Sequence, residues 1–455
     1  MGKYFGTDGF RGEANVNLTA DHAFRIGKFL GWYYSEKRRK EGEDGGPRVV
    51  IGKDTRRSSY MFEYALCAGL TSRGADAYIM HVTTTPSVSY IVRSEGCDCG
   101  IMISASHNPY YDNDIKLISA SGEKMDEETI AAVEAYLDGE TPEPPAVTRD
   151  KIGKTVDFAA GRNRYIGYLI SLATRSYSGM RIGLDCANGS AWMIAKSVFD
   201  ALGARTFVIG ASPDGLNINR GYGSTHIENL QRLVRDEKLD AGFAFDGDAD
   251  RCLCVDENGE VLTGDHIMYV CGTYMKDRNE LPGNMIVATV MSNFGFFRSL
   301  DEAGIVYEKT AVGDKYVSEA MVNNGSRLGG EQSGHIIFKK YANTGDGVLT
   351  AIKIMEVILE TKHTLSELKK PMHFYPQSLK SVHVSDQKAA LEDPVVQAAI
   401  HEAEARIGDN GRVLVRKSGT EPVIRVMAEA EDQAVCDRAV REIIGVIEAK
   451  GYAVS

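Results

Sequence analysis

The chain lacks three features that would place it at a membrane or on a nucleic acid. No apolar run approaches the length that a membrane-spanning helix needs, and the opening Met-Gly-Lys-Tyr lacks the apolar core of a secretory signal. Acidic residues also outnumber basic ones, and the 455 residues carry a formal net charge of −11. A nucleic-acid-binding protein needs a basic face. We therefore expect a cytoplasmic protein that has neither a membrane nor a nucleic acid as its partner.

Cysteine is scarce, and its spacing does not suit zinc. Eight cysteines occur, and in two close pairs, Cys97 with Cys99 and Cys252 with Cys254, a single residue separates the partners. Paired zinc ligands usually have at least two residues between them. Buried, reduced thiols in a cytoplasmic protein are the simpler interpretation.

Length and composition predict a globular protein of several domains. A chain of 455 residues is too long for a single hydrophobic core and predicts three or four domains. Hydrophobic residues make up 43% of the chain and charged residues 25%, as in ordinary globular domains. Because the net charge is negative, local arginines and lysines would have to attract any anionic ligand.

Strand and helix signals alternate along most of the chain. Short apolar runs such as residues 100–103 and 241–245 predict buried strands, and the alternation predicts parallel or mixed sheets flanked by helices. Thr225 and Glu228 have the spacing of a capping box, which predicts a helix start. After Lys370 the order changes to strands and then helices, which predicts a smaller α+β unit. The predicted domains are three α/β domains at residues 1–158, 159–256 and 257–370, and the α+β domain at residues 371–455.

The segment Ile-Ser-Ala-Ser-His-Asn-Pro at residues 103–109 presents a serine hydroxyl at the end of a predicted buried strand. Ligands of α/β sheets bind beyond the carboxyl ends of the strands, so Ser106 is a candidate for chemistry. His107 could orient this serine or stabilise charge beside it. The alternative is an ordinary turn, since Ser and Asn beside Pro are common turn residues.

Three aspartates, Asp246, Asp248 and Asp250, follow a second predicted buried strand. At every second position of an extended chain they would project to one side and repel one another, and a cation resolves the repulsion. Carboxylate ligands alone suit Mg²⁺ or Ca²⁺ better than zinc. An EF-hand is an alternative, because Glu257 falls at its last ligand position. Arg251 replaces the required glycine, however, and the flanking residues resemble strands, so we favour a magnesium site.

Two further loops carry polar groups. Residues 329–335 combine glycines with Glu331, Ser333 and His335, whose donors and acceptors suit the hydroxyls of a sugar ring. Residues 416–422 follow a predicted strand and combine Arg416, hydroxyls and a glycine. With Arg425 nearby, they have the composition of a phosphate-binding nest. The alternatives are a glycine-rich hairpin for the first loop and a capped strand-to-helix turn for the second.

These motifs together resemble the α-D-phosphohexomutase family over the whole length of the chain. The resemblance rests on Gly-Thr-Asp-Gly-Phe-Arg-Gly at residues 6–12 and on the four loops at residues 104–109, 246–251, 330–335 and 416–422. Three residues depart from the usual pattern of the family. Asp114 stands where a glycine usually precedes Ile-Lys, Tyr222 where cysteine is common, and Lys315 where arginine is usual. Asp114 adds a negative charge near Lys116, which bears on substrate affinity.

The resemblance implies three α/β domains and a fourth of different topology around a central cleft. It also implies roles for individual residues. Ser106 would carry a phosphoryl group, and Mg²⁺ would bind Ser106, Asp246, Asp248 and Asp250. Arg251 would assist electrostatically, His107 would support the serine loop, and Arg11, Lys116 and His335 would be the acid and base candidates. Sugar hydroxyls would contact Glu331 and Ser333, and the phosphate would bind to Arg416, Ser418, Gly419, Thr420 and Arg425.

The implied activity is the interconversion of glucosamine 6-phosphate and glucosamine 1-phosphate through a sugar bisphosphate, which supplies UDP-N-acetylglucosamine and cell-wall precursors. Mannose or glucose phosphates are the alternative substrates, because discrimination at one ring position depends on a few hydrogen bonds. A third reading is a sugar-phosphate-binding protein without catalysis. Such a protein should have lost Ser106 or a ligand aspartate, and none of them is missing. The predicted partners are the hexosamine phosphate, its bisphosphate and, as an option, a second copy of the chain.

Overall fold

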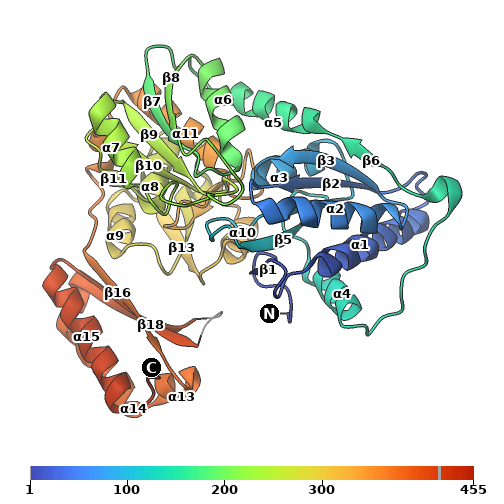
Figure 1. The fold of residues 1–455 in the computed structure, drawn as a ribbon. Coiled ribbons are helices and arrows are strands. Elements are labelled where there is room, and N and C mark those ends of the chain that lie inside the picture. The colour runs from blue at the N-terminus through green and yellow to red at the C-terminus, as the bar shows by residue number, and fades with distance from the viewer. Residues whose placement is uncertain (1, 419–421, 455) are drawn as a thin grey trace. The chain divides into compact units, whose positions relative to one another are not determined.

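In the computed structural model, which describes residues 2–418 and 422–454, the chain forms two compact units. The first comprises Met1–Met291 with Gly304–Lys370, and the second comprises Ser292–Ala303 with Pro371–Ser455. The first unit carries three sheets and the second carries one (Figure 1). Among the described residues, no helix is long and apolar enough to cross a membrane.

The first sheet has six strands, in the order β1-β5-β4-β2-β3-β6. They are β1 (Phe10–Glu13), β2 (Arg48–Lys53), β3 (Asp76–Val82), β4 (Cys99–Ile103), β5 (Asp112–Ser119) and β6 (Thr155–Asp157). β4 runs parallel to β2 and antiparallel to β5. All five residues of β4 are buried, which confirms the buried strand predicted at residues 100–103. The loop after β4 therefore leaves the carboxyl edge of the sheet, where α/β proteins bind ligands.

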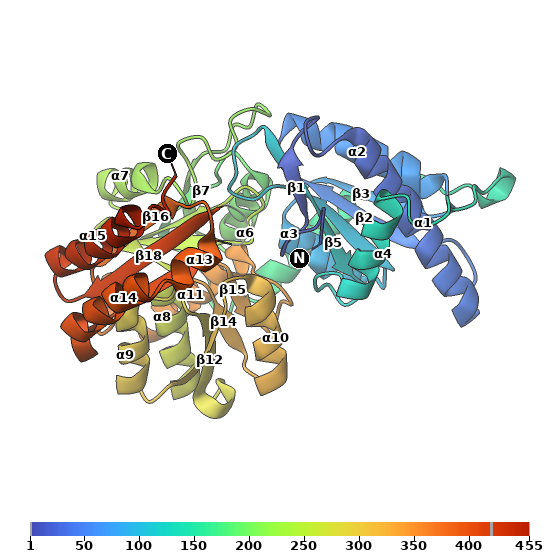
Figure 2. The ribbon, with the colours of Figure 1, turned by 90° about the horizontal axis from the view of Figure 1, so that it is seen from below.

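Helices cover both faces of this sheet (Figure 2). They are α1 (Ala20–Glu41), α2 (Arg57–Thr71), α3 (Thr85–Ser94) and α4 (Glu127–Leu137). On one face, residues of α1, α2 and α4 share a core with β4, in which Leu66 and Ile101 are fully buried. On the other face, Val88 of α3 packs in a core with Met102. Alternate residues of β4 thus enter different cores, as the two-residue period of a strand requires.

The second sheet has the order β11-β10-β9-β7-β8. Its strands are β7 (Arg181–Asp185), β8 (Arg205–Ile209), β9 (Ala241–Phe245), β10 (Cys252–Asp256) and β11 (Val261–Leu262), and the helices around it are α5 (Ala159–Ser171), α6 (Ala195–Ala201) and α7 (Glu228–Glu237). β9 is fully buried, as predicted. It runs parallel to β7 and antiparallel to β10.

The capping box predicted at Thr225 and Glu228 is wrong. α7 begins at Glu228 itself, its N-cap is Ile227, and no side chain caps it. The residues before it form a turn, in which Ser224 N–H donates to the carbonyl of Phe245 (2.9 Å) and His226 N–H donates to the carbonyl of Gly223 (3.0 Å). Because these backbone bonds hold the segment against the end of β9, the helix does not start at residue 226, where a cap at Thr225 would place it.

The third sheet has the order β13-β12-β14-β15. Its strands are β12 (Met285–Thr289), β13 (Val306–Thr310), β14 (Leu328–Gly330) and β15 (Ile336–Phe338), and the helices of this region are α8 (Gly264–Asp277), α10 (Asp314–Asn324), α11 (Gly347–Thr361) and α12 (Leu365–Lys369). α10 packs on this sheet through Val317 and Met321. α8 contacts both β10 and β14, and α11 contacts both β9 and β15, so these two helices join the second sheet to the third.

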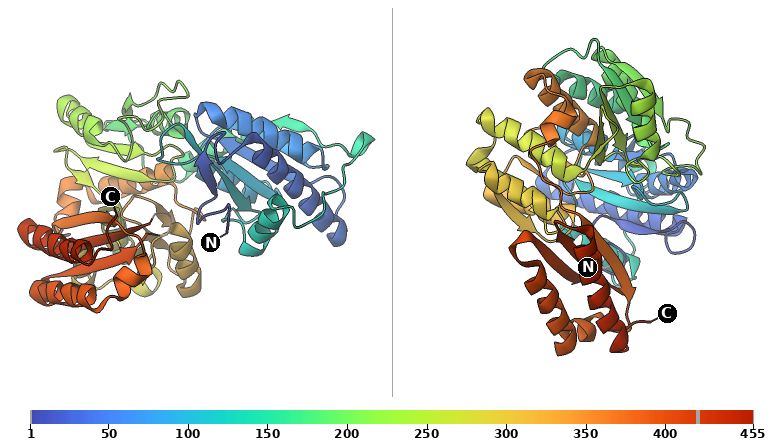
Figure 3. Two further views of the ribbon diagram at one scale, coloured as in Figure 1. Left: turned by 60° about the horizontal axis from the view of Figure 1, so that its bottom comes forward. Right: turned by 90° about the vertical axis from the view of Figure 1, so that its left-hand side faces the viewer.

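The second unit is a three-stranded antiparallel sheet with helices (Figure 3). Its elements are β16 (Gln377–His383), β17 (Gly411–Lys417), β18 (Val423–Ala430), α9 (Phe294–Glu302), α13 (Gln387–Glu392), α14 (Pro394–Ile407) and α15 (Gln433–Ala449). Ile400 of α14 and Val440 of α15 share a core with Val426 of the central strand. This arrangement confirms the predicted fold class, three α/β sheets followed by a smaller C-terminal unit of different topology.

All eight cysteines are free thiols and buried. Cys97 and Cys99 do not act as a pair, because Cys97 packs in the core beneath α3 whereas Cys99 packs in the core beneath α1 and α2. Burial raises the pKa of the Cys186 thiol above its ordinary value, and it does the same for Cys271. Inert structural thiols account for these positions.

Candidate functional site

The loop between β4 and β5 holds Ser106 in a backbone conformation that is unusual for serine. Its φ is +51°, in the left-handed region, and the residue is 3% exposed. Its carbonyl oxygen accepts hydrogen bonds from Arg56 Nη2 (3.1 Å) and Asn219 Nδ2 (2.8 Å), and its N–H donates to Ser104 Oγ (3.1 Å). These bonds stabilise a conformation that costs about 1 kcal/mol or more, a cost often found at functional sites.

The aspartate loop after β9 lies directly against this serine. Ser106 Oγ donates a hydrogen bond to Asp246 Oδ2. The next residue must be small, because a Cβ on Gly247 would lie 2.4 Å from the carbonyl oxygen of Ser106. Two loops that are 140 positions apart in the sequence therefore place a hydroxyl on a carboxylate.

Asp246, Asp248 and Asp250 form one buried carboxylate cluster. One oxygen from each lies within 4.8 Å of the others, and the residues are at most 7% exposed. Oδ1 of Asp248 and Oδ1 of Asp250 are buried, and no described group donates a hydrogen bond to either. Burial, and then the neighbouring Asp250 and Asp248 charges, raise the pKa of Asp246 well above its ordinary value. Three converging carboxylates, two of which present an oxygen without a donor, suit a divalent cation, which would relieve this repulsion.

The fourth EF-hand position does not join this cluster. Glu257 follows β10, and its carboxylate accepts hydrogen bonds from the hydroxyl of Ser366 in α12 and from the backbone N–H of the same residue (3.4 Å). Among the described residues, the metal-binding group consists of the three aspartates alone. The structure therefore excludes the EF-hand interpretation.

Lys116 of β5 supplies the nearest cation. Its Nζ lies 2.8 Å from Asp248 Oδ2 and 2.8 Å from Asp8 Oδ2, and 4.0 Å from Asp250 Oδ2. Although burial acts to lower the pKa of Lys116, the charges of Asp248 and Asp8 raise it well above its ordinary value. The ammonium group is therefore charged at neutral pH, and in this state it donates hydrogen bonds and does not accept a proton.

Arg251 and His107 form a second layer around the serine. Arg251 Nη1 lies 3.1 Å from His107 Nδ1, which lies 3.3 Å from Ser106 Oγ. Burial, and then the charge of Arg251, lower the pKa of His107 to about 4. His107 is thus neutral at pH 7, and its Nδ1 accepts from the guanidinium. His107 thus contacts both Arg251 and the serine, and its predicted support of the serine loop stays a prediction.

The loop between β14 and β15 is a hairpin connection that also presents the predicted polar groups. Backbone N–H groups of Cys252 and Gly264 donate to the carbonyls of Gly334 and Gln332, both at 3.0 Å. Gly334 has a φ of +94°, and a Cβ there would lie 2.3 Å from the carbonyl oxygen of Cys252. The hairpin alternative is therefore correct about the backbone, and the hairpin is anchored beside the aspartate loop.

Within this hairpin, Glu331 Oε1 accepts from the N–H of Gly313 (3.1 Å). Ser333 Oγ is buried, and no described group bonds to it. His335 Nε2 accepts from the N–H of Gly345 (3.2 Å), while its buried Nδ1 likewise has no partner in the described part of the chain. Unpaired buried polar atoms are costly, so these two groups are candidates for contact with a polar ligand.

A small cavity lies beside Asp250 of the aspartate loop. It has a volume of about 30 Å³, and its lining includes Asp8, Lys116, Lys124, Asp250 and Asp314. Lys124 Nζ joins the first and third α/β regions, since it lies 3.0 Å from Asp8 Oδ1 and 2.7 Å from Asp314 Oδ1. Positive and negative side chains thus alternate around a space next to the carboxylate cluster.

The predicted phosphate loop belongs to the second unit. Arg416 of β17 and Arg425 of β18 are cross-strand partners. Burial, and then the charge of Arg425, lower the pKa of Arg416. Two like charges directly opposite each other on a sheet destabilise it unless an anion lies between them. Ser418 is buried, and its N–H donates to the carbonyl of Val423 (2.9 Å), whereas Gly419 and Thr420 lie outside the described residues.

Sequence reasoning missed several residues of this site. Arg56 and Asn219 hold the serine backbone, Thr85 Oγ1 donates to Asp248 Oδ2 (2.5 Å), and Asp8 pairs with Lys116. Arg56 and Thr85 follow the carboxyl ends of β2 and β3, so the rule that drew attention to Ser106 could have found them. Asp8 lies in the motif at residues 6–12, which assigned it no role, and Asn219 does not follow the end of a strand.

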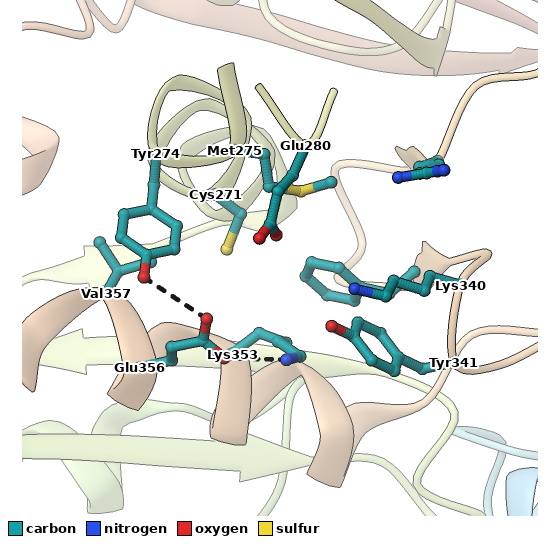
Figure 4. A pocket seen from close by; sticks show the side chains of 11 residues that line it. Cys271, Tyr274, Met275, Glu280, Lys340, Tyr341, Lys353, Glu356 and Val357 are labelled. Carbon is teal, nitrogen blue, oxygen red and sulfur yellow. Dashed lines mark hydrogen bonds and ion pairs between the residues drawn. The ribbon is translucent and has the colours of Figure 1, made fainter. Parts of the chain in front are cut away.

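A second pocket lies away from these loops (Figure 4). It is lined by α8, α11 and the end of β15, and its volume is about 30 Å³. Glu356 accepts hydrogen bonds from Tyr274 Oη (3.4 Å) and Lys353 Nζ (2.8 Å). Polar groups of its wall therefore pair with each other, and the described residues that line it include none from the four motif loops. The motif loops remain the candidate site.

Four family models match successive parts of the chain. They are described as phosphoglucomutase/phosphomannomutase alpha/beta/alpha domain I, domain II, domain III and C-terminal domain, and they match residues 2–143, 163–259, 263–375 and 379–446. The matches follow the four sheets in order.

Full-length relatives are also found. The chain is 65% identical over 454 residues to the phosphoglucosamine mutase of Lachnospira eligens, with 100% of each chain covered. It is 60% identical over 452 residues to the phosphoglucosamine mutase of Lachnoclostridium phytofermentans, with 99% of each covered. A solved structure of Aspergillus fumigatus N-acetylphosphoglucosamine mutase in complex with GlcNAc-6P and magnesium has a TM-score of 0.68 and 18% identity, and the match covers 98% of this chain and 96% of that one. At that identity the likeness concerns the fold alone.

Proposed function

Since the chain belongs to the phosphoglucomutase/phosphomannomutase family, we propose that it is an isomerase that interconverts glucosamine 6-phosphate and glucosamine 1-phosphate. The observation that carries the proposal is the contact of the Ser106 hydroxyl with a buried cluster of three aspartates. Full-length relatives with 65% and 60% identity that bear the name phosphoglucosamine mutase support the choice of sugar.

In the proposed reaction, Ser106 carries a phosphoryl group at Oγ. The P–Oγ bond breaks while a bond forms from phosphorus to a hydroxyl oxygen of the bound sugar phosphate, which yields a sugar bisphosphate. The bisphosphate then turns over in the site, and its other phosphoryl group passes back to Ser106. Such transfers are accelerated mainly by positioning and by stabilisation of charge. The left-handed backbone at Ser106, fixed by Arg56 and Asn219, supplies the positioning.

We assign the metal site to Asp246, Asp248 and Asp250 together with the Ser106 oxygen. A bound Mg²⁺ would neutralise charge on the transferred group. The neighbouring cations act on the same charge, because Lys116 lies beside Asp248 and Arg251 lies beside His107.

Proton transfer and substrate binding are assigned to the remaining groups. Because Lys116 is held as an ammonium by Asp8 and Asp248, we propose it as a proton donor to the oxygen that leaves phosphorus. Arg11 and His335 are the other candidates for the acid and base roles. Glu331 and Ser333 would bind sugar hydroxyls. The phosphate that does not react would bind to Arg416, Ser418, Gly419, Thr420 and Arg425.

We further propose that four domains, at residues 1–158, 159–256, 257–370 and 371–455, share these tasks. The serine loop, the aspartate loop, the sugar loop and the phosphate loop fall in them in that order. Eight free cysteines are consistent with a reducing compartment, and we assign the protein to the cytoplasm.

The proposal is tested by assaying the purified protein on glucosamine, glucose and mannose 6-phosphates side by side, with the corresponding bisphosphate supplied. We expect the highest kcat/KM for glucosamine 6-phosphate and a weaker reaction with glucose 6-phosphate. A clear preference for mannose or glucose phosphate would reassign the chain to the phosphomannomutase and phosphoglucomutase members of the family. Binding of all three without turnover would point to a sugar-phosphate-binding protein without catalysis.

A further inference from the structure

Arg11 and Asp114 face each other across two antiparallel strands. They are register partners on β1 and β5, so their side chains project from the same face of the sheet. Arg11 Nε lies 3.0 Å from Asp114 Oδ2, and Arg11 Nη2 lies 3.2 Å from Asp8 Oδ2. Two carboxylates thus hold two of the three guanidinium nitrogens, which fixes the plane of the group.

The two partners differ sharply in exposure. The side chain of Arg11 is 34% exposed, whereas that of Asp114 is 0% exposed. Asp114 Oδ1 is buried, and within the described residues no donor reaches it. Arg11 is therefore the one described side chain that bonds directly to the buried charge of Asp114, and truncation of Arg11 would leave that charge poorly paired.

The backbone around the pair is fitted to this aspartate. A Cβ on Gly9 would lie 2.3 Å from Asp114 Oδ1 and 2.7 Å from the carbonyl oxygen of Ile115. A glycine at position 9 thus leaves the room that the carboxylate occupies. Ser104 N–H donates to the carbonyl of Asp114 (3.0 Å), so the same residue also anchors the start of the serine loop.

Arg11 points toward the groups assigned to catalysis. Its partner Asp8 also pairs with Lys116, which lies 2.8 Å from Asp248. Among the described residues, the bonds of the Arg11 guanidinium use Nε and Nη2. The N–H groups of Nη1 can therefore donate to a ligand. A long arginine side chain loses rotamer freedom when it binds a ligand, so carboxylates that already restrain it prepare it for binding.

We propose that Asp114 is a positioning residue, which holds the guanidinium of Arg11 so that its remaining N–H groups meet a phosphate oxygen of the substrate. The proposal rests on the proposed function, because it takes the ligand to be a sugar phosphate. The opposite effect is the competing possibility: a buried negative charge near Lys116 could simply weaken the binding of an anion. The two accounts predict changes of opposite sign when the charge is removed.

A double-mutant cycle tests the proposal. Asp114→Asn keeps the shape of the side chain and removes its charge, and Arg11→Gln removes the group on which it acts. We expect Asp114→Asn to lower kcat/KM about tenfold in the Arg11 protein and less than about twofold in the Arg11→Gln protein, since residues that act as a unit are not additive. Equal losses in both backgrounds, or a gain in kcat/KM for Asp114→Asn, would overturn it.

Two additions keep the test decisive. Glu63→Gln is the matched control, because Glu63 forms another buried ion pair of the same domain, with Lys53, and no described residue of the site bonds to it. It should reproduce any loss of stability without the loss of kcat/KM. If Asp114→Asn does not fold, Asp114→Gly takes its place in the same cycle. Glycine removes the charge and leaves no buried polar side chain that needs Arg11 as a partner.

Binding separates this proposal from the choice of substrate. Calorimetry with glucosamine, glucose and mannose 6-phosphates, each on the four proteins of the cycle, reports the coupling without turnover. If the proposed sugar is wrong, another of the three binds best and the coupling between positions 11 and 114 persists. Loss of the coupling with every sugar phosphate would overturn the role of Asp114 alone.

Discussion

The Ser106 hydroxyl donates a hydrogen bond to the Asp246 carboxylate, although 140 positions separate the two residues in the sequence. Each lies at the carboxyl end of a buried strand, β4 in one sheet and β9 in another. The contact therefore requires that the edges of two sheets meet. Gly247 makes this approach possible, because any side chain there would collide with the carbonyl of Ser106.

Replacing Ser106 by alanine should abolish nearly all mutase turnover, because no other hydroxyl of the serine loop contacts the aspartate cluster in the described structure. The free energy of unfolding should fall by no more than about 1 to 2 kcal/mol, the usual cost of one lost buried hydrogen bond. Single-turnover assays and urea unfolding measure the two effects. Ser326→Ala, which truncates a buried serine whose hydroxyl bonds to backbone groups of Met285 and Leu328, should keep full turnover.

Chelation should also stop the reaction. We expect EDTA to abolish turnover and Mg²⁺ to restore it, and Asp250→Asn to raise the Mg²⁺ concentration needed by at least about tenfold. Asp250 is a cleaner choice than Asp248, which is bound at 2.8 Å by Lys116 and would free that lysine as well. Full activity in the chelated enzyme would contradict the metal assignment.

Glu257→Gln serves as the control for the metal experiment. Glu257 has the sequence spacing of an EF-hand ligand, yet its carboxylate is bound by Ser366. Its substitution should leave the Mg²⁺ requirement unchanged. A shift as large as that of Asp250→Asn would show that the three aspartates do not act alone.

Sequence patterns were sufficient for the groups that follow strand ends. The runs before Ser106 and Asp246 contain no polar side chain, as is typical of strands covered on both faces, so the polar loops after them were predicted to lie at a sheet edge. Some helix ends do follow local chemistry, since Asp126 caps α4 by accepting from the N–H of Thr129 (2.8 Å).

Residues whose role depends on tertiary contacts could not be predicted in this way. Arg56 and Asn219 act on the carbonyl of Ser106, whose direction follows from a positive φ that no sequence pattern specifies. Thr225 and Glu228 had a correct capping spacing, but backbone bonds to β9 held the segment in a turn. In each case a contact between residues far apart in the sequence determined the local structure, which the local sequence pattern alone did not predict.

Substrate choice and phosphate binding should separate by mutation. Arg416→Ala should lower kcat/KM for glucosamine, glucose and mannose phosphates by similar factors, about 10- to 100-fold, because it removes a charge-assisted contact with a phosphate that all three share. Glu331→Gln should instead change the ratios among the sugars. Steady-state kinetics on the three substrates measures both effects, and unequal losses in Arg416→Ala would place discrimination in the phosphate loop.

The stability of the first unit should depend on pH through Asp346. This carboxylate caps α11 by accepting from Leu349 N–H (2.9 Å) and also accepts from the hydroxyl of Tyr165 (2.7 Å). Burial nevertheless raises its pKa from 3.8 to about 6. The folded state thus holds the proton more tightly than the unfolded state. The protonated Asp346 therefore stabilises the folded state, and this contribution is complete below about pH 4 and is lost as the pH rises through about 6.

Asp346→Asn should remove that loss. The asparagine cannot ionise, its oxygen can still accept from Leu349, and its amide can donate to the Tyr165 oxygen. We therefore expect the variant to be more stable than the parent by about 1 to 3 kcal/mol at pH 8 and equally stable at pH 4, because one pKa unit corresponds to about 1.4 kcal/mol. Urea unfolding at both pH values measures this.

Asp393→Asn provides the comparison of opposite sign. Asp393 caps α14 and, although burial acts to raise its pKa, the hydrogen bond from Val395 N–H lowers it below the ordinary value. Its contribution is therefore present at neutral pH and lost as the pH falls, so Asp393→Asn should destabilise the second unit at pH 8 and have less effect near pH 3. If Asp346→Asn were also destabilising at pH 8, the hydrogen bonds of the charged carboxylate would outweigh its burial, and Asp346 would be ionised at little cost.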